Sequence, residues 1–267
     1  MITIEIMGGL GNQLFQVFTL ISYGLSNNAL IYFENIESNN LDRPRYWNNL
    51  LSELKILLKQ PINNIPILKE NSFHYTEIQF INNVNYKLFG YYQSYKYFIH
   101  HQDTIYKMLR INEKKEEIKI DCSEKVSLHF RLGDYKKLTD YHPILSINYY
   151  IKALEDLIKN TNRNDWNILY FYETTDEEII KEKIHKLKNI FSTLTFEPIE
   201  HVYKDYEQML IMSKCNHNII ANSSFSWWGA YLNENKNKKV YYPSNWFGPK
   251  LSNKNTKDMY PKEWIKI

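Results

Sequence analysis

Three short segments concentrate the residue types that bind anions and polar ligands. The first is Gly8-Gly9-Leu10-Gly11-Asn12-Gln13, which follows the β-branched run Ile2–Met7. A glycine-rich turn between a strand and a helix aims backbone N–H groups and the positive end of the helix dipole at an anion or polar ligand. We therefore select Gly9, Gly11 and Asn12 as candidate ligand-binding residues. The alternative is a tight turn that binds nothing.

This turn matches neither of the common nucleotide-binding motifs. A dinucleotide fingerprint needs glycine where Leu14 stands, and no Gly-Lys-Ser/Thr follows to make a P-loop. Glu34, however, lies near the end of the next predicted strand, where a ribose-binding acid falls in dinucleotide-binding proteins. An NAD-dependent oxidoreductase therefore stays open as an alternative of a different class.

The second segment runs from His129 to Tyr135 and reads His-Phe-Arg-Leu-Gly-Asp-Tyr at the end of a predicted strand. Side chains alternate along a strand, so His129 and Arg131 are expected on one side and Phe130 on the other. Ligands of parallel α/β sheets bind at this end, and an Arg holds a diphosphate by paired, charge-assisted bonds. The alternative is a structural Arg131–Asp134 ion pair beside a core histidine.

The third segment, Asn222–Gly229, follows the apolar residues Ile219, Ile220 and Ala221. It is again a strand end that leads into a helix, here with several hydroxyls that can cap the helix or bond a phosphate. The alternative is a helix N-cap followed by two core tryptophans. Capping alone does not need such a cluster of hydroxyls, so we also expect ligand contact here.

Composition limits the classes of protein to be considered. The net charge of +3 is nearly balanced, which argues against a dedicated nucleic-acid binder. Only five of the 33 basic residues are Arg, and the chain has eight glycines, so each Arg or Gly is informative. Cys122 and Cys215 are too few for a disulfide framework or a zinc site and fit a reducing compartment. With no long apolar run and no basic leader, we expect a cytoplasmic protein without a transmembrane segment.

The hydrophobic pattern predicts two successive α/β layers. In the first half, a strand at 2–7, a helix at 13–27 and a strand at 29–33 form a βαβ unit with parallel strands. A helix at 50–59 and an extended 90–94 segment follow, and Ser94 is expected to cap a helix running to about Arg110. The second half alternates strands and helices: strands at 125–130, 168–172, 218–221 and 240–242, and helices at 147–159, 176–188, 206–214 and 224–233.

A highly charged run at 113–121, poor in large apolar residues, marks the expected domain boundary. We therefore predict an N-terminal domain at 1–115 and a C-terminal domain at 116–267, both Rossmann-like and facing a cleft. A single doubly wound sheet is the alternative.

Four segments in this order resemble the inverting α-1,2-fucosyltransferases of glycosyltransferase family 11. They span most of the chain: Gly8-Gly9-Leu10-Gly11-Asn12-Gln13-Leu14-Phe15-Gln16, Gly90-Tyr91-Tyr92-Gln93-Ser94, His129-x-Arg131-x-Gly133-Asp134-Tyr135, and Ile219-Ile220-Ala221-Asn222-Ser223-Ser224-Phe225-Ser226-Trp227-Trp228-Gly229.

The resemblance implies an α/β fold of the GT-B type, with two Rossmann-like domains facing a central cleft. The domain at 1–115 would take the acceptor and the domain at 116–267 the sugar-nucleotide donor. L-Fucose would move from GDP-β-L-fucose, a co-substrate, to a hydroxyl of a glycan acceptor, giving an α-1,2 linkage. No metal or other cofactor is expected, and the sequence also has no Asp-x-Asp motif. The expected partners are the sugar nucleotide and the glycan, not nucleic acid, with peripheral membrane association only if the acceptor is lipid-linked.

The resemblance also implies roles for individual residues. Arg131 would hold the β-phosphate of the leaving GDP, while His129 and Asp134 would shape or contact the donor site. Asn12 and its loop would lie near the fucose and the acceptor. The expected catalytic residues are Arg131, Asn12 and His129, and the expected donor-binding residues are Gly9, Gly11, Arg131, Asp134, Asn222, Ser223, Ser224 and Phe225.

The chain departs from the family pattern at three places. Members often have Phe-Ser-Asp-Asp at the 171–174 segment, an Arg where Leu132 stands and an acid near Gln208. A transferase for another nucleotide-deoxysugar therefore remains an alternative. A non-catalytic glycan-binding module, with the many tyrosines and tryptophans as sugar platforms, is another. The general base is not identified, and Asp134, Glu34 and His129 are candidates by residue type only.

Overall fold

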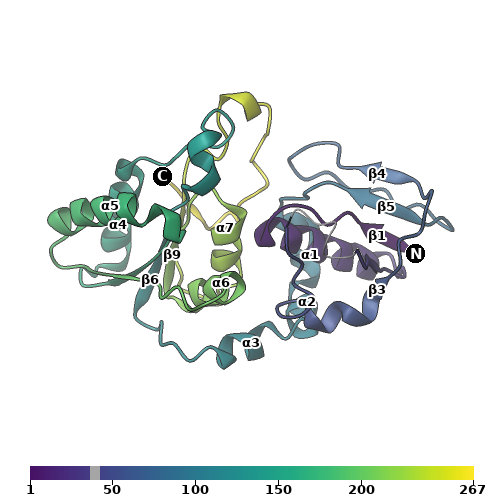
Figure 1. Ribbon diagram of the computed structural model, residues 1–267, viewed down its shortest axis with the longest axis horizontal. Helices are drawn as coiled ribbons and strands as arrows, with labels where there is room; N and C mark the ends of the chain where they lie inside the picture. The colour runs from purple at the N-terminus through teal and green to yellow at the C-terminus, as the bar shows by residue number, and fades with distance from the viewer. Residues whose placement is uncertain (37–42) are drawn as a thin grey trace. The chain divides into compact units, whose positions relative to one another are not determined.

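A computed structural model describes residues 1–36 and 43–267, which divide into two compact units. Unit 1 comprises Met1–Glu117 and Lys254–Pro261, and unit 2 comprises Ile118–Asn253 and Lys262–Ile267 (Figure 1). The division after Glu117 lies two residues beyond the predicted boundary. The assignment of Lys254–Pro261 to unit 1 has no counterpart in the prediction, which left the C-terminal segment with the second domain.

Unit 1 is built on parallel strands. A three-stranded sheet has the order β1-β5-β4, and residues 30–32 run beside the free edge of β1, where the Ile2 N–H donates to the Leu30 carbonyl at 2.9 Å. β2 then pairs with β3. The carboxyl ends of β1 and β5 therefore lie side by side. The strands are β1 (Ile2–Ile4), β2 (Phe33–Glu34), β3 (Leu58–Lys59), β4 (Ile67–Lys69) and β5 (Tyr86–Phe89).

The helices of unit 1 follow the prediction in part. The long amphipathic helix after the glycine-rich turn is confirmed, but the predicted helix at 50–59 is a 3-10 helix followed by β3, because residues 58–59 pair with β2. Ser94 accepts the Lys96 N–H at 3.3 Å, so it caps a 3-10 turn, not a helix reaching Arg110. The helices are α1 (Leu10–Ser26), η2 (Ser52–Leu57), η3 (Tyr95–Tyr97), η4 (Ile99–His101), α2 (Gln102–Met108) and α3 (Ile111–Glu117).

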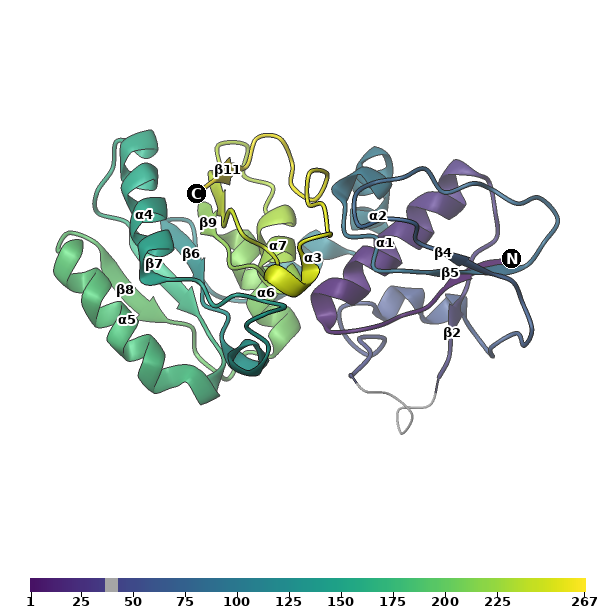
Figure 2. The same ribbon diagram turned by 90° about the horizontal axis from the view of Figure 1, so that it is seen from above.

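Unit 2 contains a six-stranded, all-parallel sheet with the order β8-β7-β6-β9-β10-β11. In chain order this is the 3-2-1-4-5-6 arrangement of dinucleotide-binding folds. Helices α4 and α5 cover one face and α6 and α7 the other (Figures 1 and 2). The strands are β6 (Lys125–His129), β7 (Asn167–Phe171), β8 (Thr195–Pro198), β9 (His217–Ile219), β10 (Val240–Tyr242) and β11 (Ile265–Lys266), and the helices are η5 (Gly133–Lys137), α4 (Ile147–Thr161), η6 (Thr174–Asp176), α5 (Glu177–Ile190), α6 (Asp205–Lys214), α7 (Ser224–Tyr231) and η7 (Pro249–Leu251).

The described strands thus form three separate parallel sheets, two in unit 1 and one in unit 2, and the alternative of one doubly wound sheet is wrong. The reversal in strand order between β6 and β9 creates a switch point, where the loops after the two neighbouring strands turn to opposite faces of the sheet.

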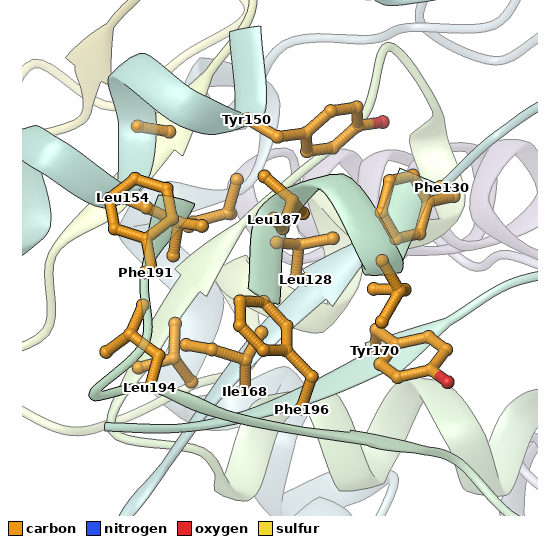
Figure 3. Close-up of a cluster of buried hydrophobic side chains, with 14 of the residues drawn as sticks. Leu128, Phe130, Tyr150, Leu154, Ile168, Tyr170, Leu187, Phe191, Leu194 and Phe196 are labelled. Atoms are coloured by element: carbon orange, nitrogen blue, oxygen red, sulfur yellow. The ribbon is translucent and has the colours of Figure 1, made fainter. Parts of the chain in front are cut away.

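The two faces of β6 differ in polarity, with apolar side chains on one face and polar side chains on the other. Leu128 and Phe130 are buried among apolar side chains of α4 and α5 (Figure 3). On the other face, the Ser127 hydroxyl accepts a hydrogen bond from Asn218 at 2.7 Å, and the His129 ring lies 5.7 Å from that of Phe225. The predicted separation of His129 from Phe130 is confirmed.

Truncation of this core is expected to destabilise unit 2. Leu128 is fully buried, so Leu128→Ala should lower the free energy of unfolding by about 2–5 kcal/mol through lost burial and a residual cavity. Urea unfolding followed by tryptophan fluorescence measures this, since five of the six tryptophans belong to unit 2. Leu138→Ala, at a 41% exposed position, serves as control with a change within about 0.5 kcal/mol. Equal losses in the two variants would contradict the described core.

Candidate functional site

The carboxyl ends of β6 and β9 bring the second and third sequence motifs together in unit 2. The two strands are paired in parallel, with Leu128 opposite Ile219. Arg131 and Asn222 therefore leave adjacent strands at the same edge of the sheet. The Tyr135 hydroxyl joins the two loops by donating to the Asn222 carbonyl at 3.0 Å. This is the switch point at which α/β sheets of this topology bind ligands.

Arg131 is held between two carboxylates at this edge. Its guanidinium donates to Asp134 at 2.5 Å and to Glu173, which follows β7, and it lies 5.0 Å from the Tyr135 ring centre. The Arg131–Asp134 ion pair of the structural alternative is therefore present, and Glu173 extends it. The Arg131 Nε is buried and has no hydrogen-bond partner in the described part of the chain. The Nε–H group of Arg131 is thus left to donate to another acceptor.

The loop that carries Arg131 is fixed by a buried acid that the sequence analysis did not select. Asp176 is 1% exposed and accepts the Gly133 N–H at 2.8 Å and the Lys136 ammonium at 2.5 Å. Gly133 has a positive φ of 38°, and a Cβ there would lie 2.5 Å from a carboxylate oxygen of Glu173. Glycine is needed here because it permits both the turn and the approach of Glu173.

His129 is a buried, neutral histidine. Burial, and secondarily the positive charge of Arg131, lowers its pKa from 6.5 to about 3. Its carbonyl accepts the Tyr150 hydroxyl at 3.2 Å, while the Nδ1 atom is buried without a hydrogen-bond partner among the described residues. A side chain with so low a pKa is a weak proton acceptor at neutral pH. His129 can therefore contact a ligand by hydrogen bonding and packing, but it is poorly suited to take up a proton.

The side chain of Asn222, just before α7, is held by two hydrogen bonds. Its amide donates to the carbonyls of Pro143 at 2.9 Å and Trp246 at 3.3 Å, while its Oδ1 is buried with no partner in the described ranges. Ser223 is the N-cap residue, but its side chain makes no capping bond, so capping does not account for that hydroxyl. The first turn of α7, which begins at Ser224, therefore keeps N–H groups without side-chain caps.

The remaining prediction for this segment concerned its tryptophans. Trp227 and Trp228 are fully buried, as the structural alternative predicted. The segment thus combines core packing at its end with an uncapped helix start at its beginning.

His142 is a further residue that the sequence analysis missed. Its ring stacks on Tyr135, with the centres 4.6 Å apart and the planes at 17°, and burial lowers its pKa. Its buried Nδ1 has no partner in the described chain, as is true of atoms in His129, Arg131 and Asn222. Buried polar atoms are normally hydrogen-bonded, so this group at one sheet edge indicates a place for a polar ligand. His142 lies outside the 129–135 motif, so the motif did not mark it.

In unit 1, the first motif lies at the corresponding edge, beside the end of β5. Gly8 has a positive φ of 72°, and a Cβ there would lie 2.5 Å from the Asn12 amide nitrogen. Asn12 accepts a hydrogen bond from the Gln93 side chain at 2.7 Å. Gln16 accepts the Met7 N–H at 2.9 Å and donates to the Gly90 carbonyl at 3.0 Å. These bonds join the Gly8–Gln16 motif to the Gly90–Ser94 motif.

The turn leaves the start of α1 open. Gly9 is its N-cap and is exposed, and a Cβ at Gly9 would meet no atom within 4 Å. Gly11 is buried within the first turn of α1. The predicted residues Gly9, Gly11 and Asn12 are thus gathered in unit 1, whereas His129, Arg131, Asp134 and the 222–225 segment are gathered in unit 2.

The Glu34 carboxylate forms an ion pair with a lysine side chain. It accepts a hydrogen bond from the Lys87 ammonium at 2.8 Å, and Lys87 also contacts Glu5 at 3.1 Å. This pairing does not favour the ribose-binding role on which the oxidoreductase alternative depended. Across residues 1–36 and 43–267, no three His, Cys, Asp or Glu side chains form a group that could hold a metal ion.

Comparison with known protein families gives the assignment. The model described as "Glycosyl transferase family 11" matches residues 1–267. The chain belongs to glycosyltransferase family 11. It is therefore a glycosyltransferase, a class whose substrates are a sugar nucleotide and a glycan acceptor, and the oxidoreductase and binding-module alternatives are not supported.

Two Escherichia coli relatives are similar over nearly the whole chain. "O-antigen biosynthesis glycosyltransferase WbnK" is 28% identical over 296 residues, covering 90% of this chain and 93% of the relative. "Alpha-1,2-colitosyltransferase" is 27% identical over 271 residues, covering 91% of each.

Solved structures show the fold. E. coli ADP-heptose lipopolysaccharide heptosyltransferase II aligns with a TM-score of 0.51 at 10% identity, covering 100% of this chain and 89% of that protein. The predicted α/β fold of the GT-B type is confirmed. Within the described ranges, no helix is long and apolar enough to cross a membrane.

The lowered pKa of His129 predicts a pH-dependent stability. Unfolded His129 takes up a proton near pH 6.5, whereas the folded residue does so only near pH 3. The unfolded state therefore binds more protons as the pH falls through this window, and stability is lost. At about 1.4 kcal/mol per pH unit, this histidine should cost about 2 kcal/mol between pH 6.5 and about pH 5.

The comparison is made with His129→Gln by urea unfolding at about pH 7 and about pH 5. The unsubstituted protein is expected to lose about 2 kcal/mol more than the variant over this range. Burial also lowers the pKa of His217, to about 4, but that contribution is common to both proteins and cancels. Equal losses would show that His129 is not buried as described.

Proposed function

We propose that this glycosyltransferase moves L-fucose from GDP-β-L-fucose to a hydroxyl of a glycan acceptor, with inversion and formation of an α-1,2 linkage. The observation that carries the proposal is the meeting of Arg131 with the start of α7 at the switch point of unit 2. A guanidinium and uncapped helix N–H groups are the donors that a nucleoside diphosphate requires. Within this proposal, Asn222, Ser223, Ser224 and Phe225 line the nucleotide.

The reaction is a single in-line displacement. The acceptor oxygen forms a bond to the anomeric carbon as the bond from that carbon to the diphosphate oxygen breaks, and the electron pair leaves with GDP. The acceptor hydroxyl loses its proton to water, so the products are the glycoside, GDP and a proton. Negative charge grows on the leaving diphosphate, where donors that are already oriented stabilise the transition state.

The two carboxylates around Arg131 orient its guanidinium before the donor arrives. Asp134 and Glu173 use the two terminal nitrogens, and Nε stays available. The same carboxylates repel a bound diphosphate, so the N–H groups of α7 and the hydroxyls of Ser223 and Ser224 supply the compensating bonds. In unit 1, Asn12 with Gly9 and Gly11 is proposed to serve the sugar and the acceptor.

A transferase for another nucleotide-deoxysugar is the second candidate. Two observations favour it: one relative is named for colitosyl transfer, and this chain has Glu173-Thr174 where the family often has two Asp residues. Colitose is itself a deoxysugar, so the same diphosphate site serves both candidates. A screen of sugar nucleotides, read by released nucleoside diphosphate, separates them.

Arg131→Lys tests the diphosphate role. The change keeps the positive charge but loses the planar guanidinium with its several N–H donors. Turnover should therefore fall at least about 100-fold, which is the effect of removing one preorganised transition-state donor. Initial rates of GDP release with saturating donor and acceptor provide the measurement. Arg163→Lys is the matched control, because Arg163 pairs with Glu124 and Asp165 away from this edge and should retain near-normal turnover.

Unchanged turnover in a folded Arg131→Lys protein would remove this role. Near-UV circular dichroism and the urea midpoint establish that the variant is folded. A fall of equal size in Arg163→Lys would show instead that the loss reflects a general effect of replacing arginine.

We further propose that transfer needs no divalent metal, because guanidinium, helix N–H groups and hydroxyls neutralise the diphosphate. Prolonged treatment with EDTA should leave the initial rate within about twofold of the untreated protein, since no preorganised donor is removed. The same assay with added Mg²⁺ or Mn²⁺ completes the test. Strict dependence on either ion would overturn this part of the proposal.

A further inference from the structure

Glu70 is a partly buried carboxylate at the carboxyl edge of the first sheet. It follows β4 directly and accepts the backbone N–H groups of Tyr91 at 2.8 Å and Tyr92 at 3.1 Å. These two residues belong to the Gly90–Ser94 motif, which in turn contacts Asn12 through Gln93. Glu70 therefore lies at the same edge as the residues already assigned to unit 1, although it belongs to none of the sequence motifs.

The turn that Glu70 holds is conformationally unusual. Tyr92 has a positive φ of 52°, which is uncommon for a bulky residue. A Cβ at Gly90 would lie 2.4 Å from the Cβ of Glu70, so the acid packs directly on that glycine. Backbone held in a sparsely populated region by specific contacts occurs preferentially at binding and active sites.

A series of tyrosine rings leads from the Gly90–Ser94 motif to Tyr75. The rings of Tyr75 and Tyr97 lie 4.8 Å apart, and those of Tyr97 and Tyr92 lie 5.3 Å apart. Tyr75 is 36% exposed, and Tyr91, which donates its N–H to Glu70, is 39% exposed. The surface at this edge of the sheet thus offers accessible tyrosines next to a hydrogen-bond acceptor.

Glu70 has acceptor capacity beyond its two backbone bonds. Burial raises the pKa of its carboxyl, even though the two N–H groups and the positive charge of Lys254 act in the opposite direction. A carboxylate has about four lone-pair sites, of which the backbone occupies two. A partly desolvated acceptor with free lone pairs is stabilised by a hydroxyl donor from a ligand.

A pyranose ring has the matching chemistry. One face carries C–H groups that stack on an aromatic ring, and its edge carries hydroxyls that donate hydrogen bonds. Tyrosine combines an apolar ring with a polar tip and suits such a ligand. Methyl β-D-galactopyranoside is an appropriate probe, because its C3, C4 and C5 hydrogens lie on one face.

We propose that Glu70, Tyr75 and Tyr91 form a binding subsite for a pyranose of the glycan acceptor. Glu70 accepts a hydrogen bond from a sugar hydroxyl, and the two exposed tyrosines contact the apolar face of the ring. Binding of a pyranoside is a property of unit 1 alone, whereas the identification of that sugar as the acceptor rests on the proposed function.

Saturation-transfer NMR with methyl β-D-galactopyranoside tests the subsite on the full chain. The unsubstituted protein should transfer magnetisation to the sugar ring protons, and Tyr75→Ala and Tyr91→Ala should weaken binding at least about 10-fold. Phe80→Ala, at a position in unit 1 that is also 36% exposed, is the matched control and should bind as the unsubstituted protein does. Absence of transfer, or equal binding by all four proteins, would overturn the proposal.

Glu70→Gln tests the carboxylate itself, and near-UV circular dichroism of the variant reports whether the turn is kept. Tyr91 and Tyr92 donate to different oxygens of Glu70, so glutamine keeps one of these backbone bonds and loses the other together with the charge. Glycoside binding should therefore weaken at least about 10-fold. Glu53→Gln, which alters a carboxylate paired with Lys114, is the control expected to bind normally. Normal binding by a folded Glu70→Gln protein would reduce Glu70 to a structural role. Failure of the donor function would appear instead as absence of GDP binding, which these variants do not address.

Discussion

The parallel pairing of β6 with β9 is the contact on which the candidate donor site depends. It places the loop that carries Arg131 beside the segment that begins at Asn222, although 90 residues separate them in sequence. The two loops diverge because the strand order reverses between these strands, and this divergence exposes backbone N–H groups and side chains at one edge. Two side-chain hydrogen bonds reinforce the pairing. Asn218 donates to Ser127 within the strands, and Tyr135 donates to the Asn222 carbonyl in the loops that follow them. Unit 1 repeats the principle, with its two family motifs after the neighbouring strands β1 and β5.

Charge balance at Arg131 shapes the proposed chemistry. Two carboxylates orient the guanidinium but also neutralise its charge, so Arg131 does not present an unpaired positive charge to a phosphate. A diphosphate is bound most strongly where the N–H groups of a helix start and nearby hydroxyls also donate to it, because these donors are not already paired with carboxylates. The proposed donor site therefore uses the motif around Asn222 as well as Arg131. It also gives Glu173 a physical meaning: it is a departure from the family pattern that lies in direct contact with the arginine most important to the proposal.

The sequence predicted the parts of the fold and the site that depend on local pattern. Strand ends followed by Gly, Arg and hydroxyl residues identified the sheet edges that form the candidate site, because strand-to-helix turns of this kind have local signatures. Glu70 and Asp176 were missed because their importance comes from partners far away in sequence, which only the folded chain brings together. His142 was missed because it lies outside the 129–135 motif, although it stacks on Tyr135 of that motif. The short strands β3, β4, β5, β8 and β11 were missed for a related reason: they contain two to four residues, too few for a periodic pattern, and are stabilised by their neighbours in the sheet.

A crystal structure of the protein with GDP tests the central claim most directly, because the claim concerns where a diphosphate binds. We predict that the β-phosphate lies within hydrogen-bonding distance of the Arg131 guanidinium and that the phosphates meet the first N–H groups of α7. Phosphates bound instead at the Gly8–Gln13 turn of unit 1, or GDP that binds without contacting Arg131, would contradict the account.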